Sequence, residues 1–282
     1  MWWKIILIAV GSIIVMAVSS VTIGNIIFKR KVNSEVAELL TKVRETKSNI
    51  ITEEGLEGLP EPVQKYLRYT GAIGKEKTEA VRLKQKGSFR QGDRPWMPFE
   101  AEQYYTTNPP SFIWIADMKA FPLLSVKGRD MYYQGKGNML IKIPPFVTIA
   151  DARGKEIDQG TLVRYLNEVM WFPSAYLNDY VKWESIDSTS AKATITYGGV
   201  TASAILYFDD EGKLTNFVAQ RYMMEDEKYS LETWATPIEE YREINGLRLP
   251  VKGEGVWKLD SGDFPYIRVE ITDIEYNNTS LY

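Results

Sequence analysis

The chain has 282 residues, of which 44% are hydrophobic and 25% are charged, and its net charge is −3. This composition is that of a folded protein rather than a disordered one. The sequence contains no Cys and no His, which excludes disulfides, a thiol nucleophile, a Cys or His zinc site and a His-based triad. We predict no catalytic residue, metal or cofactor among the reactive groups that remain.

The first predicted element is an uncharged, largely apolar segment of 24 residues, Ile5–Phe28. As an α-helix it exceeds the roughly 30 Å hydrocarbon thickness of a bilayer, at about 1.5 Å per residue. Two Trp residues precede it and the basic run Lys29–Lys31 follows it, as is typical of interfacial flanks. The alternative, a cleaved signal peptide, has a shorter apolar core of about 7 to 15 residues. We therefore predict that residues 1–31 are a transmembrane anchor that contacts the membrane through residues 5–28.

This anchor predicts a single-pass protein of the cell membrane. The basic residues flanking the segment mildly favour a cytoplasmic carboxyl-terminal domain. We nevertheless expect the β domain to be extracytoplasmic, because a binding function in the cell envelope requires that side. After residue 31 the chain carries 30 basic against 37 acidic residues. An acidic domain is a poor surface for nucleic acid, so we predict no nucleic-acid partner.

Residues 32–76 are predicted to form a stalk helix and a short capping helix. Apolar residues recur at helical spacing from Ser34 to Lys47, which predicts an amphipathic continuation of the anchor. A second helix begins at Leu59–Pro62 and ends near Gly71, because Pro suits a first helical turn and Gly a helix end.

From Lys77 the apolar residues alternate with polar ones, which is typical of half-buried strands. The Gly198–Gly199 pair predicts a two-residue hairpin, and Asn245–Gly246 predicts a second in which Glu243 opposes Arg248. We predict ten or eleven strands up to Tyr276. Residues 77–282 are therefore expected to form a single antiparallel β domain.

A helical insertion near residues 158–178 interrupts these strands. Asp158 is predicted to cap a helix with apolar residues on one side, and Trp171–Pro173 breaks it. The predicted fold class is mainly β with added helices. It is a large antiparallel sheet or open half-barrel whose concave face is covered by the inserted helix, with apolar room beneath that helix.

The densest polar cluster lies between an apolar run and this helix, and it has two interpretations. Asp151, Arg153 and Asp158 contain the groups of a carboxylate-dependent hydrolase or lyase. In the structural interpretation Arg153 pairs with Asp151 or Glu156, while Asp158 caps the helix. Ion-pair networks of this kind have the same residue pattern, and we favour the structural interpretation.

Several motifs resemble those of an uncharacterised family of bacterial membrane-anchored proteins. They are LPEPVQKYL at residues 59–67, DARG at 151–154, DQG at 158–160, WFP at 171–173 and FPY at 264–266. The resemblance implies relatives but no catalytic residues. The expected architecture is also similar to the lipoprotein-localisation-factor and lipid-carrier half-barrels, which implies an apolar ligand such as an acyl chain and an extracytoplasmic domain.

We therefore predict a membrane-anchored protein that binds a lipid, another apolar small molecule or a hydrophobic part of an envelope partner. The alternatives are the carboxylate-dependent enzyme and a structural interaction module with an exposed apolar patch. The candidate ligand-binding residues lie in the polar cluster and on the inserted helix: Asp151, Arg153, Asp158, Gln159, Leu162, Leu166, Met170 and Trp171.

Overall fold

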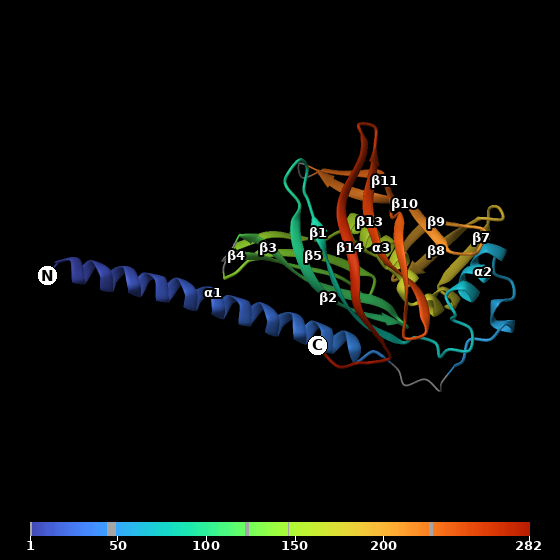
Figure 1. Ribbon diagram of the computed structural model, residues 1–282, viewed down its shortest axis with the longest axis horizontal. Coiled ribbons are helices and arrows are strands. Elements are labelled where there is room, and N and C mark those ends of the chain that lie inside the picture. The colour runs from blue at the N-terminus through green and yellow to red at the C-terminus, as the bar shows by residue number, and fades with distance from the viewer. Residues whose placement is uncertain (1, 44–48, 122–123, 146, 226–227) are drawn as a thin grey trace.

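The computed structural model describes residues 2–43, 49–121, 124–145, 147–225 and 228–282 (Figure 1). Its helices and strands, in chain order, are α1 (Trp2–Leu40), η1 (Glu54–Leu56), α2 (Glu61–Tyr69), β1 (Ala80–Phe89), β2 (Met97–Thr107), β3 (Pro110–Phe121), β4 (Leu124–Tyr133), β5 (Lys136–Ile143), β6 (Val147–Ala152), α3 (Lys155–Glu168), η2 (Val169–Trp171), η3 (Pro173–Leu177), β7 (Val181–Ser185), β8 (Ser190–Tyr197), β9 (Val200–Phe208), β10 (Leu214–Glu225), β11 (Lys228–Ala235), β12 (Ile238–Ile244), β13 (Leu247–Leu259) and β14 (Gly262–Tyr276).

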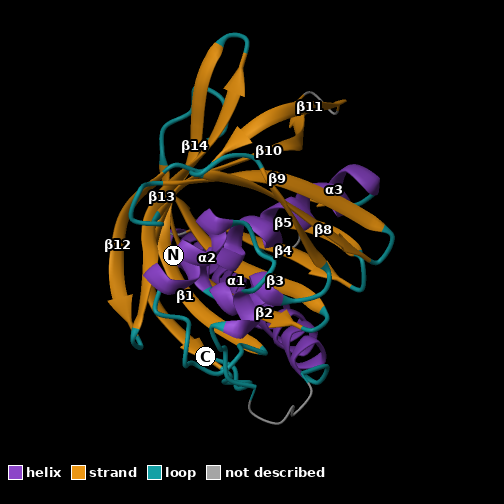
Figure 2. Cartoon of the chain, turned by 90° about the vertical axis from the view of Figure 1, so that its right-hand side faces the viewer, coloured by secondary structure: helices purple, strands orange, loops and turns teal. Residues whose placement is uncertain are grey.

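All the strands join one antiparallel sheet. Its order is β6-β5-β4-β3-β2-β1-β14-β13-β11-β10-β9-β8-β7, and β12 pairs with β13 beside this path. The sheet curls around the helices, as the end-on view in Figure 2 shows. The predicted fold class is therefore confirmed: the protein is mainly β, with an open half-barrel, a helix inside it and a long apolar helix before it.

Both predicted two-residue hairpins are present with the predicted register. Tyr197 pairs with Val200 across one turn, and Glu243 pairs with Arg248 across the other. The Gly residues of these turns have positive φ, which is the conformation that a type I′ turn requires. The local turn chemistry therefore sets these registers.

The two halves of the sheet meet at a pair of hairpin turns. A Cβ atom on Gly135, in the β4–β5 turn, would lie 2.7 Å from the Cα of Gly198 in the β8–β9 turn. Beside this contact the Tyr132 hydroxyl donates to the Tyr197 carbonyl over 3.1 Å. Backbone approach this close requires Gly, so the curled sheet is held together here without strand pairing.

Helix α3 lies in the concave face and begins three residues before the predicted start. Its N-cap is Gly154, with φ of +119°, so the prediction that Asp158 caps the helix is wrong. The Asp158 carboxylate instead accepts from the Gly137 amide over 2.7 Å and from Lys136 over 3.0 Å. It is used to fix the helix to β5, and is therefore not available as a cap.

One end of the half-barrel is closed by α2 and the short 3₁₀ helices η2 and η3. Tyr66 of α2 is fully buried, and its ring lies 5.6 Å from Phe208 and 6.3 Å from Tyr176 between ring centroids. Its hydroxyl donates to the Met170 carbonyl over 3.2 Å. Aromatic packing of this kind is stronger than area burial alone, so this end is tightly filled.

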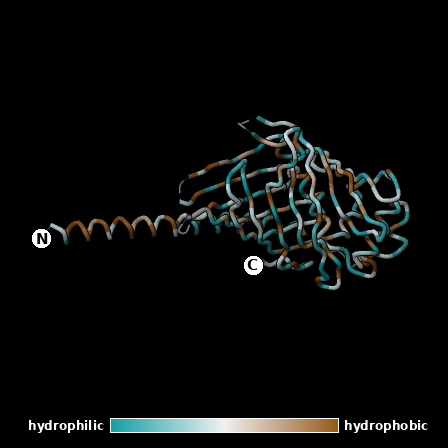
Figure 3. The backbone as a smooth tube through the Cα atoms, turned by 45° about the horizontal axis from the view of Figure 1, so that its top comes forward, coloured by the Kyte–Doolittle hydropathy of each residue, from teal (hydrophilic) through white to brown (hydrophobic). Residues whose placement is uncertain are grey.

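Helix α1 has two parts with different surroundings. Its amino-terminal part projects from the domain and is apolar, as Figure 3 shows. This helix is long and apolar enough to cross a membrane, and its most apolar stretch is not buried by the protein. The stalk predicted to Lys47 ends at Leu40, and residues 44–48 lie outside the described residues.

The carboxyl-terminal part of α1 packs on the convex face of the sheet. Its buried side chains are Phe28, Val32, Val36, Leu39 and Leu40, which form a separate core with Ala80, Tyr104, Ile113 and Leu140. The same part of α1 forms an ion pair with the sheet, in which Arg129 Nε lies 3.1 Å from Glu35 Oε2. The sheet is thus covered by a helix on each face.

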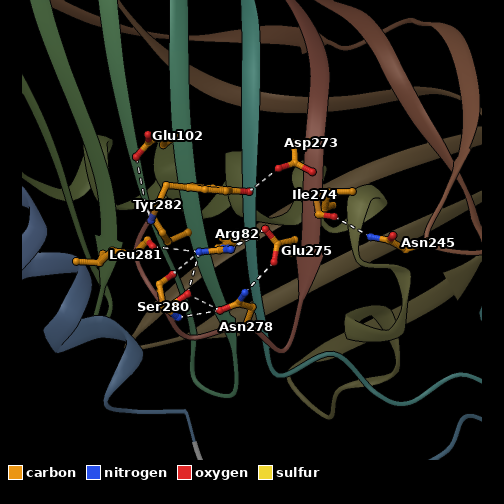
Figure 4. Close-up of polar contacts among 11 residues, drawn as sticks. Arg82, Glu102, Asn245, Asp273, Ile274, Glu275, Asn278, Ser280, Leu281 and Tyr282 are labelled. Carbon is orange, nitrogen blue, oxygen red and sulfur yellow. Dashed lines mark hydrogen bonds and ion pairs between the residues drawn. The ribbon is translucent and has the colours of Figure 1, made fainter.

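The chain ends beside this second core. Arg82 holds the last residues: its guanidinium donates to Glu275 Oε1 over 2.7 Å and to the carbonyls of Ser280 and Leu281, each over 3.1 Å (Figure 4). The same guanidinium lies over the Tyr282 ring at 4.3 Å. Arg82 therefore ties the last residues of the chain to β1.

Candidate functional site

The apolar candidates on the inserted helix are core residues. Leu162 and Leu166 are completely buried, and Met170 and Trp171 are only 7% and 6% exposed. The Trp171 indole donates to the Pro250 carbonyl over 3.0 Å. The sheet beneath α3 is thus covered by the protein's own side chains, so the prediction of apolar room beneath the inserted helix is wrong for these residues.

The polar candidates do not converge on one site. Asp151 accepts from Asn138 Nδ2 over 2.7 Å and lies 3.4 Å from Arg153 Nε, beside the convex face that carries α1. The hydrogen bond from Asn138 and, to a smaller extent, the Arg153 charge lower the Asp151 pKa. In the described part of the chain no hydrogen bond or ion pair joins either residue to Asp158. The structural interpretation of the sequence predicted this ion pair between Arg153 and Asp151.

Gln159 contacts the sheet at the other side of α3. Its side-chain amide donates to the Gln220 carbonyl over 2.9 Å, while its Oε1 is buried and has no partner among the described residues. Gln159 therefore connects the first turns of α3 to β10.

A buried polar network around Glu168 and Arg164 was not predicted from the sequence. Glu168 Oε2 accepts from Gln103 over 2.8 Å and from the Tyr105 hydroxyl over 3.0 Å. Its Oε1 accepts from Arg164 Nε over 2.8 Å, and the same guanidinium pairs with Asp130 over 2.8 Å. Arg164 and Glu168 are four residues apart on a helix, a spacing typical of ion pairs, and this was the one signal in the sequence.

The carboxylates of this network keep Arg164 charged. Burial lowers the pKa of Arg164, but the carboxylates of Glu168 and Asp130 more than offset it, so the pKa lies above its usual value. Burial and the Glu168 charge raise the Tyr105 pKa. Every oxygen of Glu168 is occupied by a protein donor, which is the arrangement of a structural network rather than of a free acid or base.

Uncovered apolar surface remains at the opposite, open end of the half-barrel. Apolar side chains at the strand ends there pack against the main core but are only half-buried: Phe89, Met97, Val126, Met223, Phe264 and Tyr266. They come from β1, β2, β4, β10 and β14, so five strands contribute to one rim. We call this set the open-end surface.

A cation lies next to the open-end surface. Arg221 is half-buried, with its guanidinium 4.7 Å from the Trp234 ring and 5.7 Å from the Trp257 ring. It donates to the Gly160 carbonyl of α3 and to the Tyr266 hydroxyl, each over 3.1 Å. The Trp234 indole N–H is buried without a partner in the described residues. The apolar rim therefore has hydrogen-bond donors beside it.

A surface hollow of about 210 Å³ lies on the convex side, and its chemistry is different. Its lining is mostly charged: Lys86, Glu239, Lys252, Gly253, Arg268, Val269 and Glu270. Glu270 pairs there with Lys86 and Arg242. Exposed ion pairs of this kind contribute little to stability because solvent screens them, and the charged hollow does not suit an apolar ligand.

Comparison with known proteins places the chain in a family. A model of DUF6544, a family of unknown function, matches residues 49–269. The chain belongs to this family. The match confirms the predicted resemblance to an uncharacterised family, and it covers α2, α3 and most of the sheet but not α1. No curated protein matches the chain.

Among solved structures, a LolA superfamily protein from Nitrosomonas europaea is similar to this DUF6544 chain. The two are 10% identical, the alignment covers 77% of this chain and 92% of that chain, and the TM-score is 0.43.

Proposed function

We propose that this protein is a membrane-anchored binding protein that holds the apolar chain of a lipid-like molecule at the open end of its half-barrel. The observation that carries the proposal is the open-end surface, where Met and aromatic side chains lie half-buried on the concave face. At the closed end the central aromatic side chains Tyr66, Phe172 and Tyr176 are fully buried among α2, η2 and η3. The open end therefore gathers half-buried Met and aromatic side chains from several strands where a ligand can reach them.

The residue types at this surface suit an apolar chain. Met97 and Met223 are unbranched and polarizable, so they adapt to ligands of different shape. Each buried methylene of a ligand contributes about 0.8 kcal/mol. Arg221, which has no ion-pair partner in the part of the chain that the structure describes, would lie beside a polar or anionic head group, where a guanidinium donates strongly.

The anchor completes the proposal. The exposed apolar part of α1 is long enough to span a bilayer, and it would keep the half-barrel at a membrane surface. A binding protein needs no proton shuttle, which agrees with the lack of His and Cys.

Native mass spectrometry of the full-length, detergent-purified protein tests the function. We expect a retained lipid, and displacement of an apolar dye by added lipid. Met97→Glu should abolish both, because a charge at the open-end surface opposes apolar burial, while the melting temperature changes little. The matched control is Ile186→Glu, since Ile186 is exposed and follows β7, far from the open end. Unchanged lipid retention in Met97→Glu would refute the proposal.

A further inference from the structure

We infer that the β5–β6 hairpin is a second membrane contact, which inserts into the bilayer interface beside α1. The inference rests on the anchor of the proposed function, but not on lipid binding by the half-barrel. It follows from three observations: where the hairpin touches α1, which residues it carries, and how firmly α1 is held.

The hairpin touches α1 within the predicted transmembrane segment. A Cβ atom on Gly24 would collide with the backbone of Pro145, so the helix and the hairpin are in direct contact. Gly24 lies four residues before Phe28, the last apolar residue of the segment, which is about 6 Å along the helix axis. If the basic run Lys29–Lys31 lies at the interface, Pro145 must lie below it, on the side of the acyl chains.

The residues of the hairpin suit that depth. No charged residue occurs from Ile143 to Ala150. Val147 and Ile149 of β6 are 56% and 54% exposed, although β6 is the edge strand of the sheet. Soluble proteins usually protect an edge strand with charges, Pro or a covering element. An uncovered apolar edge beside a membrane helix therefore points to lipid as its cover.

Helix α1 cannot easily turn away from the hairpin, because polar contacts hold it to β4. Glu35 pairs with the buried Arg129 at 3.1 Å, and Glu38 accepts from the Tyr133 hydroxyl over 3.1 Å. The spacing of the buried residues Gly24, Phe28 and Val32 presents one continuous helix face to the domain. A bilayer that contains the apolar part of α1 must therefore also meet the hairpin.

Backbone chemistry limits how deep the hairpin goes. The outer edge of β6 has backbone N–H and C=O groups without a neighbouring strand, and such groups are costly in the hydrocarbon core. The interfacial zone still provides water and head groups as partners. We place Val147 at this level, which would orient one rim of the half-barrel toward the membrane.

Fluorescent labelling at single cysteines tests the contact, because the native chain has no Cys. Val147→Cys carries an environment-sensitive dye in the full-length protein, reconstituted into phosphatidylcholine–phosphatidylglycerol vesicles with spin-labelled acyl chains. Val15→Cys, in the exposed part of α1, is the positive control. Ile186→Cys, equally exposed but distant from α1, is the negative control.

The inference predicts that lipid quenching at position 147 resembles that at position 15, and that position 186 is not quenched. Quenching at position 15 with position 147 behaving like position 186 would overturn the hairpin contact and leave the anchor intact. No quenching at position 15 would overturn both. A label at position 147 that is shielded without lipid quenching, together with disulfide-linked dimers of Val147→Cys, would show instead that a second copy covers the edge.

Discussion

Strand β4 places two neighbouring charged residues on opposite faces of the sheet, and each holds a helix. Asp130 points into the half-barrel and pairs with Arg164 of α3 at 2.8 Å. Arg129 points outward and pairs with Glu35 of α1 at 3.1 Å. The comparison of these two attachments shows how the same sheet holds one helix as part of its core and the other as a separate element on its outer face.

The two attachments differ in how fully their charges are compensated. Inside, Arg164 has two carboxylate partners and Glu168 has three donors. Outside, the Arg129 pair has poorly aligned hydrogen bonds, and burial lowers the Arg129 pKa although Glu35 opposes this. A buried charge is stabilising only when its geometry and partners are good, so the inner attachment should contribute more to folding.

The largest effect is expected from Glu168→Ala, because it leaves Gln103, Tyr105 and part of Arg164 without an acceptor. Breaking a buried network of this kind should lower the free energy of unfolding by about 3–5 kcal/mol, measured by urea unfolding of the detergent-purified protein. Glu184→Ala is the control: it removes an exposed ion pair with Lys192, which should change stability by less than about 1 kcal/mol. Equal effects of the two variants would contradict the assigned role of the network.

A smaller effect is expected at the outer attachment. Arg129→Met keeps most of the side-chain volume but leaves the partly exposed Glu35 carboxylate without its ion-pair partner. It should lower the free energy of unfolding by about 1–3 kcal/mol. The double variant Arg129→Met with Glu35→Met should recover stability, because no unpaired charge remains. The same urea series measures both, and a double variant that stays as unstable as Arg129→Met would show that the ion pair itself stabilises the docked helix.

Local sequence patterns account for most of the fold. The registers of the two tight hairpins, the polar–apolar alternation within strands and the helix after Pro60 depend on neighbours in sequence and were predicted. The predicted ten or eleven strands were too few, because the structure has fourteen among its described residues. The order of strands around the sheet was not predicted, because the pairing of β1 with β14 joins residues almost two hundred positions apart.

The site was predicted less well, for a related reason. The apolar stripe of α3 correctly indicated a face that packs on the sheet, but the helix is buried on further sides, including its polar residues Asp158 and Glu168. Their partners, Gly137 and Gln103, come from distant strands. From neighbouring residues alone, Asp158 was therefore predicted to be a helix cap, and no role was predicted for Glu168.

The smallest effect is expected from Tyr180→Phe, at the closed end of the half-barrel. Its hydroxyl donates to the Thr107 carbonyl over 2.7 Å and accepts from Asn178 over 2.9 Å, so losing it should cost about 1 kcal/mol near neutral pH. Burial raises the pKa of Tyr180 to about 12, above the roughly 10 of an unfolded tyrosine.

This difference in pKa gives the variant a pH signature. Below about pH 10 the hydroxyl is neutral in both states, and its contribution is fully present. Between about pH 10 and 12 the Tyr180 hydroxyl ionises in the unfolded chain but not in the folded protein, which lowers the free energy of unfolding of the wild type. The Phe variant has no hydroxyl and is not affected. The gap between wild type and variant should therefore shrink as the pH rises, which urea unfolding at about pH 8 and about pH 11 would measure. A gap that stays constant would mean that Tyr180 is not shielded at the closed end, and would weaken the contrast between that end and the open-end surface.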